Sequence, residues 1–200
     1  MNSIAHDSLN AGNIVALLGD IFERRGGEEY LGEQVTMAEH MLQGAHFAEQ
    51  RGEREEIIVA ALLHDIGHFT SEFGTFTIND TDDRFHEDAG AQLLDRFFPS
   101  LVVDCVRYHV LAKRYLCAVN PDYLGRLSDA SLHSLKLQGG PLNEAEVAEF
   151  EKNPNLQDIV SVRLLDDEAK VAGLETPVFA HFAPMVQRIV EAHALHNGNS

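Results

Sequence analysis

The strongest constraint on the fold is a short segment that has no polar position. Residues 57–63 read IIVAALL and lie within a helix that the sequence predicts over residues 53–66. A helix that is apolar on every side is buried on every side, so other elements must surround it. The rest of the chain shows mostly helical periodicity, with few alternating β patterns. We therefore predict an all-α helical bundle with this segment at its centre.

The same periodicity places the surrounding helices. We expect one domain over residues 1–200, with a core at about 30–171 and a closing helix at 178–196. Residues 70–83 are polar and contain glycine, which is typical of a functional loop or lid. The first of the other predicted helices starts at Asn10 or Asn13 and ends near Arg25, and further helices cover residues 35–50, 122–137 and 156–171. One more helix carries His86 and ends at Pro99, and the next carries His109. A short helix begins near Asn143, with a capping box to Glu146.

Composition limits the classes of function. The formal net charge is −17, which argues against nucleic acid as a partner because phosphate backbones are bound by Lys and Arg surfaces. The apolar runs are shorter than the roughly 20 residues of a membrane helix, and no secretory signal is visible. The two cysteines do not indicate a disulfide framework, so we expect a cytoplasmic protein that binds neither nucleic acid nor membrane.

Six ionisable residues fall on, or directly beside, the apolar faces of the predicted helices. One such histidine is more often a hydrogen-bonded core residue than a ligand. Burial of six is costly unless a metal centre compensates them. Four imidazoles and two carboxylates without a thiolate suit iron or manganese, and six ligands are too many for one tetrahedral ion. The predicted ligands of a two-metal site are His40, His64, Asp65, His86, His109 and Asp166.

The dipeptide His64-Asp65 indicates how the two ions are shared. Adjacent helical residues point about 100° apart, so one can bind a single ion while the other reaches toward a second. A carboxylate has two oxygens and can bridge two ions, whereas an imidazole cannot. Asp65 is therefore the expected bridge. We expect His40 and Asp166 to complete the site that includes His64, and His86 with His109 to hold the other ion.

The order H…HD…H…H…D resembles the HD-domain superfamily, and the two histidines between HD and the last aspartate resemble its dinuclear members. Residues 30–171 further resemble its mixed-valent di-iron oxygenases, which include myo-inositol oxygenase. The resemblance is closer to the enzymes that oxidatively cleave 1-hydroxy-2-aminoethylphosphonates or their trimethylammonium analogues. Separations of 24, 22, 23 and 57 residues between successive ligands are similar to those of the phosphonate enzymes. The resemblance implies two iron ions, Fe(II) and Fe(III), bridged by Asp65.

Three polar residues distinguish this group from ordinary HD phosphohydrolases. Lys113 lies one helical turn beyond His109, and Arg163 lies one turn before Asp166. With Ser131 they would form a binding site for a phosphonate dianion, in which arginine can engage two oxygens at once. A solvated helix surface is the alternative for these two cations and for Lys170.

Further site residues follow from spacing and from the resemblance. His68, one turn past His64, is placed to contact the substrate or iron-bound oxygen, and Lys170, one turn past Asp166, is placed to face the metals. By resemblance alone, Tyr30 occupies the position of a lid tyrosine that binds one iron until substrate displaces it.

By the same resemblance, Glu33 is the second member of the lid pair. In residues 69–85, Asp80 is a candidate for contact with the amine end of the substrate.

The expected activity is O2-dependent cleavage of the C–P bond of a 1-hydroxy-2-(trimethylammonio)ethylphosphonate, or of its primary-amine analogue. The products would be phosphate and glycine betaine, or glycine. An Fe(II)/Fe(III) pair carries a charge of +5, and the two ligand carboxylates reduce it to +3. This remaining positive charge favours a dianionic substrate. One alternative is an HD-type metal-dependent phosphohydrolase that acts on a small phosphate ester, and another is a degenerate regulatory HD module, although no ligand is missing.

Overall fold

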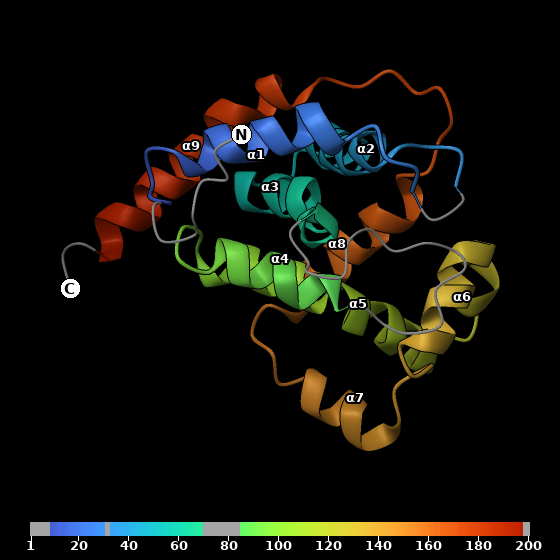
Figure 1. Cartoon of the computed structure of the whole chain (residues 1–200). Coiled ribbons are helices and arrows are strands. Elements are labelled where there is room, and N and C mark those ends of the chain that lie inside the picture. Colours follow the sequence, from blue (N-terminus) through green and yellow to red (C-terminus); the bar gives the residue numbers. More distant parts are fainter. Residues whose placement is uncertain (1–8, 31–32, 70–84, 198–200) are drawn as a thin grey trace.

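A computed structural model describes residues 9–30, 33–69 and 85–197, and every regular element in these ranges is helical (Figure 1). The all-α prediction is confirmed. No helix in these ranges is long and apolar enough to span a bilayer. The elements are α1 (Ile14–Arg25), α2 (Met37–Gln50), α3 (Glu55–Leu63), η2 (Ile66–Phe69), α4 (His86–Leu94), α5 (Ser100–Val119), η3 (Leu124–Arg126), α6 (Asp129–Leu137), α7 (Glu144–Phe150), α8 (Leu156–Glu168) and α9 (Phe179–Asn197).

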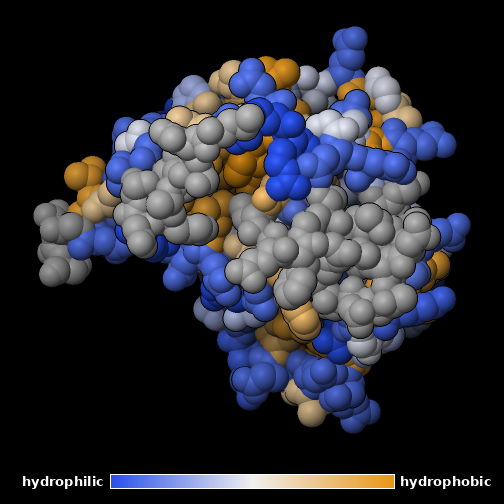
Figure 2. Space-filling view, viewed as in Figure 1, coloured by the Kyte–Doolittle hydropathy of each residue, from blue (hydrophilic) through white to orange (hydrophobic). Residues whose placement is uncertain are grey.

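Helix α3 is the centre of the bundle, as its sequence predicts. Every residue from Ile57 to Leu63 is at most 4% exposed. The helix packs against α2, α5, α8 and α9, and these helices supply the shell that an all-round apolar helix needs. Figure 1 shows α1, α2 and α9 on one side of α3 and α4 on the other. The outer face in Figure 2 is mostly hydrophilic where it is described, which agrees with the high net charge.

Helix α3 ends earlier than the predicted residue 66. It stops at Leu63, and the chain then turns through His64 and Asp65 into the 3-10 helix η2. Gly67 makes this turn possible because a Cβ there would lie 1.8 Å from the carbonyl oxygen of His86. Only glycine lets the backbone of α4 approach so closely. The turn therefore brings His86 next to Asp65.

Three other predicted helices also differ from the structure. The helix that carries His86 ends at Leu94 instead of continuing to Pro99. Residues 122–137 are two short helices, because Leu127 is extended and Ser128 caps α6 by accepting a hydrogen bond from the Ser131 amide. Helix α8 stops at Glu168, so Lys170 lies beyond it rather than one turn along it. The predicted capping box of Asn143 is confirmed.

A small second hydrophobic cluster lies beside the main core. Leu116, Tyr123, Leu127 and Leu135 form it, from the end of α5, the segment around η3, and α6. The cluster holds α6 against α5, which matters because α6 carries Ser131. Residues 70–83, the predicted lid loop, lie outside the described ranges.

Candidate metal centre

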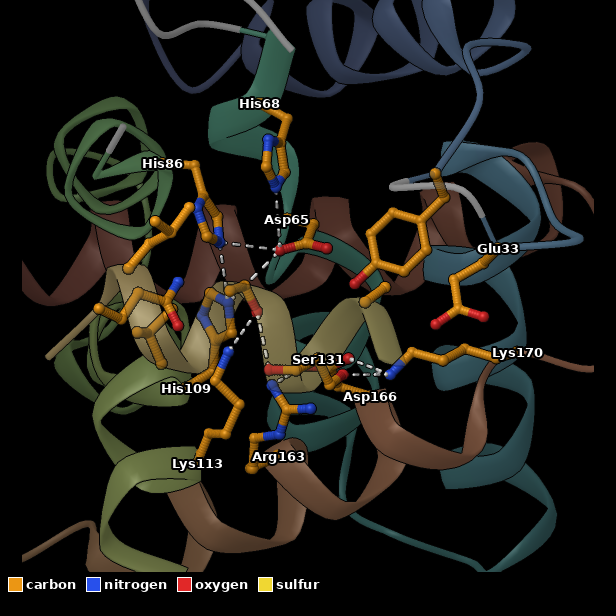
Figure 3. A pocket seen from close by; sticks show the side chains of 16 residues that line it. Glu33, Asp65, His68, His86, His109, Lys113, Ser131, Arg163, Asp166 and Lys170 are labelled. Atoms are coloured by element: carbon orange, nitrogen blue, oxygen red, sulfur yellow. Dashed lines mark hydrogen bonds and ion pairs between the residues drawn. The ribbon is translucent and has the colours of Figure 1, made fainter. Parts of the chain in front are cut away.

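The six predicted ligands converge from separate elements. His40 comes from α2, His64 and Asp65 from the turn after α3, His86 from the first position of α4, His109 from α5 and Asp166 from α8. Each is at most 9% exposed. Figure 3 shows Asp65 between the histidines of one side and the residues of α8. Residues up to 126 positions apart therefore form one buried cluster.

The two oxygens of Asp65 face different groups of ligands. Oδ2 lies 3.5 Å from His40 Nε2 and 3.4 Å from His64 Nε2. Oδ1 lies 3.2 Å from His86 Nε2 and 3.4 Å from His109 Nε2. Asp166 joins the first group, since its Oδ1 lies 3.3 Å from His40 Nε2. The carboxylate therefore has the geometry of a bridge between two sites.

Backbone carbonyls fix the orientation of three of the imidazoles. Nδ1 of His40, His64 and His109 lies 2.7–2.8 Å from the carbonyl oxygens of Ala169, Ala61 and Val106. A carbonyl oxygen can only accept, so each Nδ1 carries the proton and donates it. When such a ring is neutral, it presents a bare Nε2 to the centre of the cluster. This is the usual outer support of a metal-binding histidine.

The Nε2 atoms of the four histidines lie close together in two pairs. Nε2 of His40 lies 3.0 Å from Nε2 of His64, and Nε2 of His86 lies 3.2 Å from Nε2 of His109. The electron pairs of two such nitrogens are compensated by one shared proton or by one metal ion that both bind. Such spacings match the edge of a coordination polyhedron with metal–nitrogen bonds of about 2.1 Å.

Unpartnered oxygens point to the same conclusion. Asp65 Oδ2 and Asp166 Oδ1 are buried without a hydrogen-bond partner among the described residues. A buried carboxylate oxygen without a partner is costly unless it binds a metal. The donor set therefore fits two ions, one on each side of Asp65.

The electrostatics of the metal-free chain are consistent with cation binding. Burial opposes a charge on His64, but the carboxylates of Asp65 and Asp166 outweigh it and raise its pKa to about 9. Burial likewise opposes ionisation of Asp166, yet Arg163 and Lys170 hold its pKa well below the usual value. A metal would replace the proton on His64, because a ligand must be deprotonated to bind.

Metal removal is expected to destabilise the fold. A ligand present at about 1,000 times its Kd and bound only by the native state adds about 4 kcal/mol. In a chain of this size about 1 kcal/mol shifts Tm by roughly 2–4 °C, so chelation should lower Tm by about 10 °C. Differential scanning calorimetry before chelation, after it and after Fe(II) is restored checks this. An unchanged Tm after verified metal loss contradicts the assignment.

A polar wall lies beside this cluster. Lys113 is only 3% exposed, and its Nζ donates to Ser134 Oγ at 2.8 Å. Lys170 Nζ lies 3.3 Å from Ser131 Oγ. Figure 3 shows these cations and Arg163 around one cavity. Four of the predicted ligands line it, namely Asp65, His86, His109 and Asp166. The other polar residues that line it are Tyr30, Glu33, His68, Lys113, Ser131, Ser134, Gln138, Arg163 and Lys170.

Comparisons with known proteins agree with this geometry. The sequence pattern of the HD domain matches residues 37–145, and this range includes five of the six ligands. The chain belongs to the HD-domain family. A Leisingera caerulea protein named 1-hydroxy-2-(trimethylamino)ethyl phosphonate dioxygenase (glycine-betaine-forming) is 69% identical over 185 residues, covering 92% of this chain and 94% of that protein. A hydroxymethylphosphonate dioxygenase from Gimesia maris is 45% identical over 169 residues, covering 82% and 83%.

Lys170 of this HD domain reaches the cavity by a route that the sequence did not predict. The side chain of Gln43, on α2, pairs with the backbone of Val171: its Nε2 donates to the carbonyl at 2.8 Å, and its Oε1 accepts from the amide at 2.9 Å. With the His40–Ala169 hydrogen bond, this pairing fixes the segment after α8. Lys170 is therefore held toward Asp166, at 3.8 Å.

Tyr30, Glu33 and His68 lie at the same cavity. The Tyr30 ring stacks on His40, with centroids 3.9 Å apart, and Glu33 Oε1 accepts from Ser128 Oγ at 2.6 Å. Neither ring nitrogen of His68 has a hydrogen-bond partner in the described part of the chain. Burial, and then charge on His86, hold the pKa of His68 well below its usual value, so the ring is neutral. Asp80 lies outside the described residues.

Several residues at or behind the cavity were missed from the sequence. Ser134 lies one turn after Ser131 on α6, and Asp167 lies one turn after Arg163 on α8, so helical spacing could have found both. Gln138 and Tyr123 had no comparable local signal.

Proposed function

We propose that this chain is an O2-dependent di-iron dioxygenase that cleaves the C–P bond of 1-hydroxy-2-(trimethylammonio)ethylphosphonate to glycine betaine and phosphate. The observation that carries the proposal is a cationic wall, formed by Lys113, Arg163 and Lys170, directly beside candidate metal ligands that lie in two groups around Asp65. The name of the 69% identical relative supports the same substrate and product. One substrate and one O2 balance to these two products, so no external reductant is required.

Two iron ions would be held by the six ligands, and when bound they supply the redox chemistry with O2. His40, His64 and Asp166 would hold one ion, and His86 with His109 the other. Asp65 would bridge them. Iron suits an imidazole and carboxylate set without thiolate.

The protein's own task is to bind and orient the phosphonate. Lys113, Ser131 and Arg163 would hold its oxygens, with the Lys170 ammonium beside them. Charge-assisted hydrogen bonds in a buried site are stronger than those in water, so this wall selects a dianion over a neutral polyol. Fixed orientation of the reacting carbon next to the metals provides a large part of the rate enhancement.

The remaining residues would face the rest of the substrate. His68, neutral and without a hydrogen-bond partner within the described ranges, would contact the substrate near its reacting carbon. Tyr30 and Glu33 would close the cavity, and the Glu33 carboxylate and the Tyr30 ring offer an ammonium group charge and a π surface. Asp80 is proposed at the same amine end.

An HD phosphohydrolase is the competing activity, and dependence on O2 separates the two. We expect phosphate release from the hydroxyphosphonate to cease under anaerobic conditions and to match O2 consumption one to one in air. Product analysis by 31P NMR with an oxygen electrode measures both quantities. Anaerobic phosphate release by the Mn or Co form would establish hydrolysis instead. A mixed-valent EPR signal that the phosphonate perturbs would identify the metal pair.

The preference for a trimethylated over a primary nitrogen in the substrate is tested separately. Steady-state assays on the trimethylated and primary-amine hydroxyphosphonates should give a higher kcat/KM for the trimethylated compound. Comparable values for the two would contradict the preference while leaving C–P cleavage in place.

A further inference from the structure

The guanidinium of Arg163 is fixed on two edges by carboxylates. Its Nη1 lies 2.6 Å from Asp166 Oδ2, while its Nη2 pairs with Asp167 Oδ1 and its Nε donates to Asp167 Oδ2 at 3.2 Å. An arginine has five N–H donors, and these contacts occupy three of them. One N–H on each terminal nitrogen is left, and Arg163 lines the cavity. Asp167 therefore determines which edge of the guanidinium is presented to an anion.

Asp167 is in turn held by a buried tyrosine. The Tyr123 hydroxyl lies 3.2 Å from Arg163 Nε, which can only donate, so the hydroxyl oxygen accepts there. Its one proton is then donated to Asp167 Oδ2. Burial keeps this hydroxyl protonated, because it raises the pKa of Tyr123 above its ordinary value. The directions of the hydrogen bonds are thus fixed through the whole chain from Tyr123 to Arg163.

Tyr123 is a rigid support for this chain. It is 2% exposed and packs in the small cluster with Leu116, Leu127 and Leu135. A buried hydroxyl is costly without partners, yet phenylalanine would fill the same apolar space. Neither Tyr123 nor Asp167 is among the described residues that line the cavity, so neither touches a ligand there.

We propose that Tyr123, acting through Asp167, is a positioning residue that aims Arg163 at the anionic group of the substrate. The inference rests on the proposed function, since it gives Arg163 a phosphonate to bind. Without the Tyr123 hydroxyl, Asp167 can rotate, and the guanidinium loses its fixed orientation toward the cavity.

The test is Tyr123→Phe in the metal-loaded protein, with Tyr115→Phe as the matched control. The Tyr115 hydroxyl also donates to a carboxylate, that of Glu151 at 3.2 Å, but on the exposed side of α5. We expect Tyr123→Phe to raise KM for the hydroxyphosphonate about tenfold, the size of one hydrogen bond to a charged group. The value of kcat should change less than about threefold, because the metal ligands are untouched. Metal content should stay at the wild-type value.

A double variant shows whether the effect passes through Arg163. A lysine at position 163 has neither Nε nor the two terminal nitrogens of a guanidinium, so it cannot be oriented by Tyr123 and Asp167 in the same way. Adding Tyr123→Phe to Arg163→Lys should therefore change KM less than about twofold. The proposal is overturned if Tyr123→Phe leaves KM unchanged, if kcat falls with unchanged KM, or if the tenfold effect persists in Arg163→Lys.

Binding of inorganic phosphate separates this inference from the proposed function. Isothermal titration calorimetry measures it without turnover, and Tyr123→Phe should weaken it about tenfold. If the wild type does not oxidise the phosphonate yet this loss is seen, the proposed function fails and the positioning role stands. Equal phosphate affinity in both proteins overturns the positioning role.

Discussion

Asp65→Asn is expected to lower turnover by about three orders of magnitude or more, because both metal positions lose their shared anionic ligand. One Asp65 oxygen faces His86 and His109, and the other faces His40 and His64. An asparagine keeps the shape but offers one neutral oxygen and an NH2 group that cannot bind a cation. Metal analysis should therefore give fewer than two ions per chain, and oxygen-electrode assays should give residual activity only.

Variants of ligands that face only one of the two metal positions test the same assignment. His86→Ala and His109→Ala should each lose one ion and retain the other, because the opposite group of ligands is intact. Asp104→Asn is the matched control: this carboxylate on α5 accepts from Asn155 Nδ2 at 2.8 Å and does not line the cavity. It should keep two ions and wild-type turnover. Two ions and full turnover in any of the three ligand variants would refute the assignment.

The convergence of the six candidate ligands was predictable because each carries a local signature. A histidine or aspartate on an apolar helical face has few reasons to be there, and six such residues point to one buried centre. The outcome is a cluster in which Asp65 divides its two oxygens between two groups, as its position beside His64 indicates. The place where α3 ends was not predictable in this way. It depends on the close approach of Gly67 to His86, a contact between elements whose spacing is set by tertiary packing.

The cavity wall was predictable only in part. Helical spacing placed Lys113 and Arg163 correctly relative to their neighbouring ligands. Lys170 was expected on the same helix as Asp166, but Gln43 holds its segment from a position 128 residues away. No local pattern records a hydrogen bond over that separation. For the same reason Tyr123 was not predicted: it lies in the turn before η3, and its partner Asp167 lies 44 residues away on α8.

The cationic wall also has a dependence on pH, which comes from Lys113. Burial, and then repulsion from Arg163, lower the pKa of its ammonium to about 7, against the attraction of Asp166 and Asp167. A bound dianion favours the charged form and raises that pKa again. Below pH 7 the lysine is already protonated, so its contribution to binding is fully present. Above pH 7 binding must take up a proton, and affinity falls by up to about tenfold per pH unit until the pKa of the complex is passed.

Lys113→Met should therefore have two effects at once. Methionine fills the buried space of the lysine stem but removes the charge, so KM for the hydroxyphosphonate at pH 7 should rise about 10- to 100-fold, the range for a hydrogen bond to a charged group. The variant's KM should also lose the part of the pH dependence between 7 and 9 that belongs to the lysine. Lys136→Met, an exposed position on α6, is the control and should match the wild type.

The ratio of the variant's KM to that of the wild type isolates Lys113 from the ionisation of the phosphonate, which is common to both. This ratio should be largest below pH 7, where the wild-type lysine is fully protonated before binding, and shrink toward 1 at higher pH, where that lysine is neutral before binding. A ratio that is constant from pH 6 to 9 would mean that Lys113 keeps its charge throughout. A ratio of 1 at every pH would remove it from the phosphonate site. Each result leaves the metal ligands unaffected, since Lys113 Nζ bonds to Ser134 rather than to the cluster.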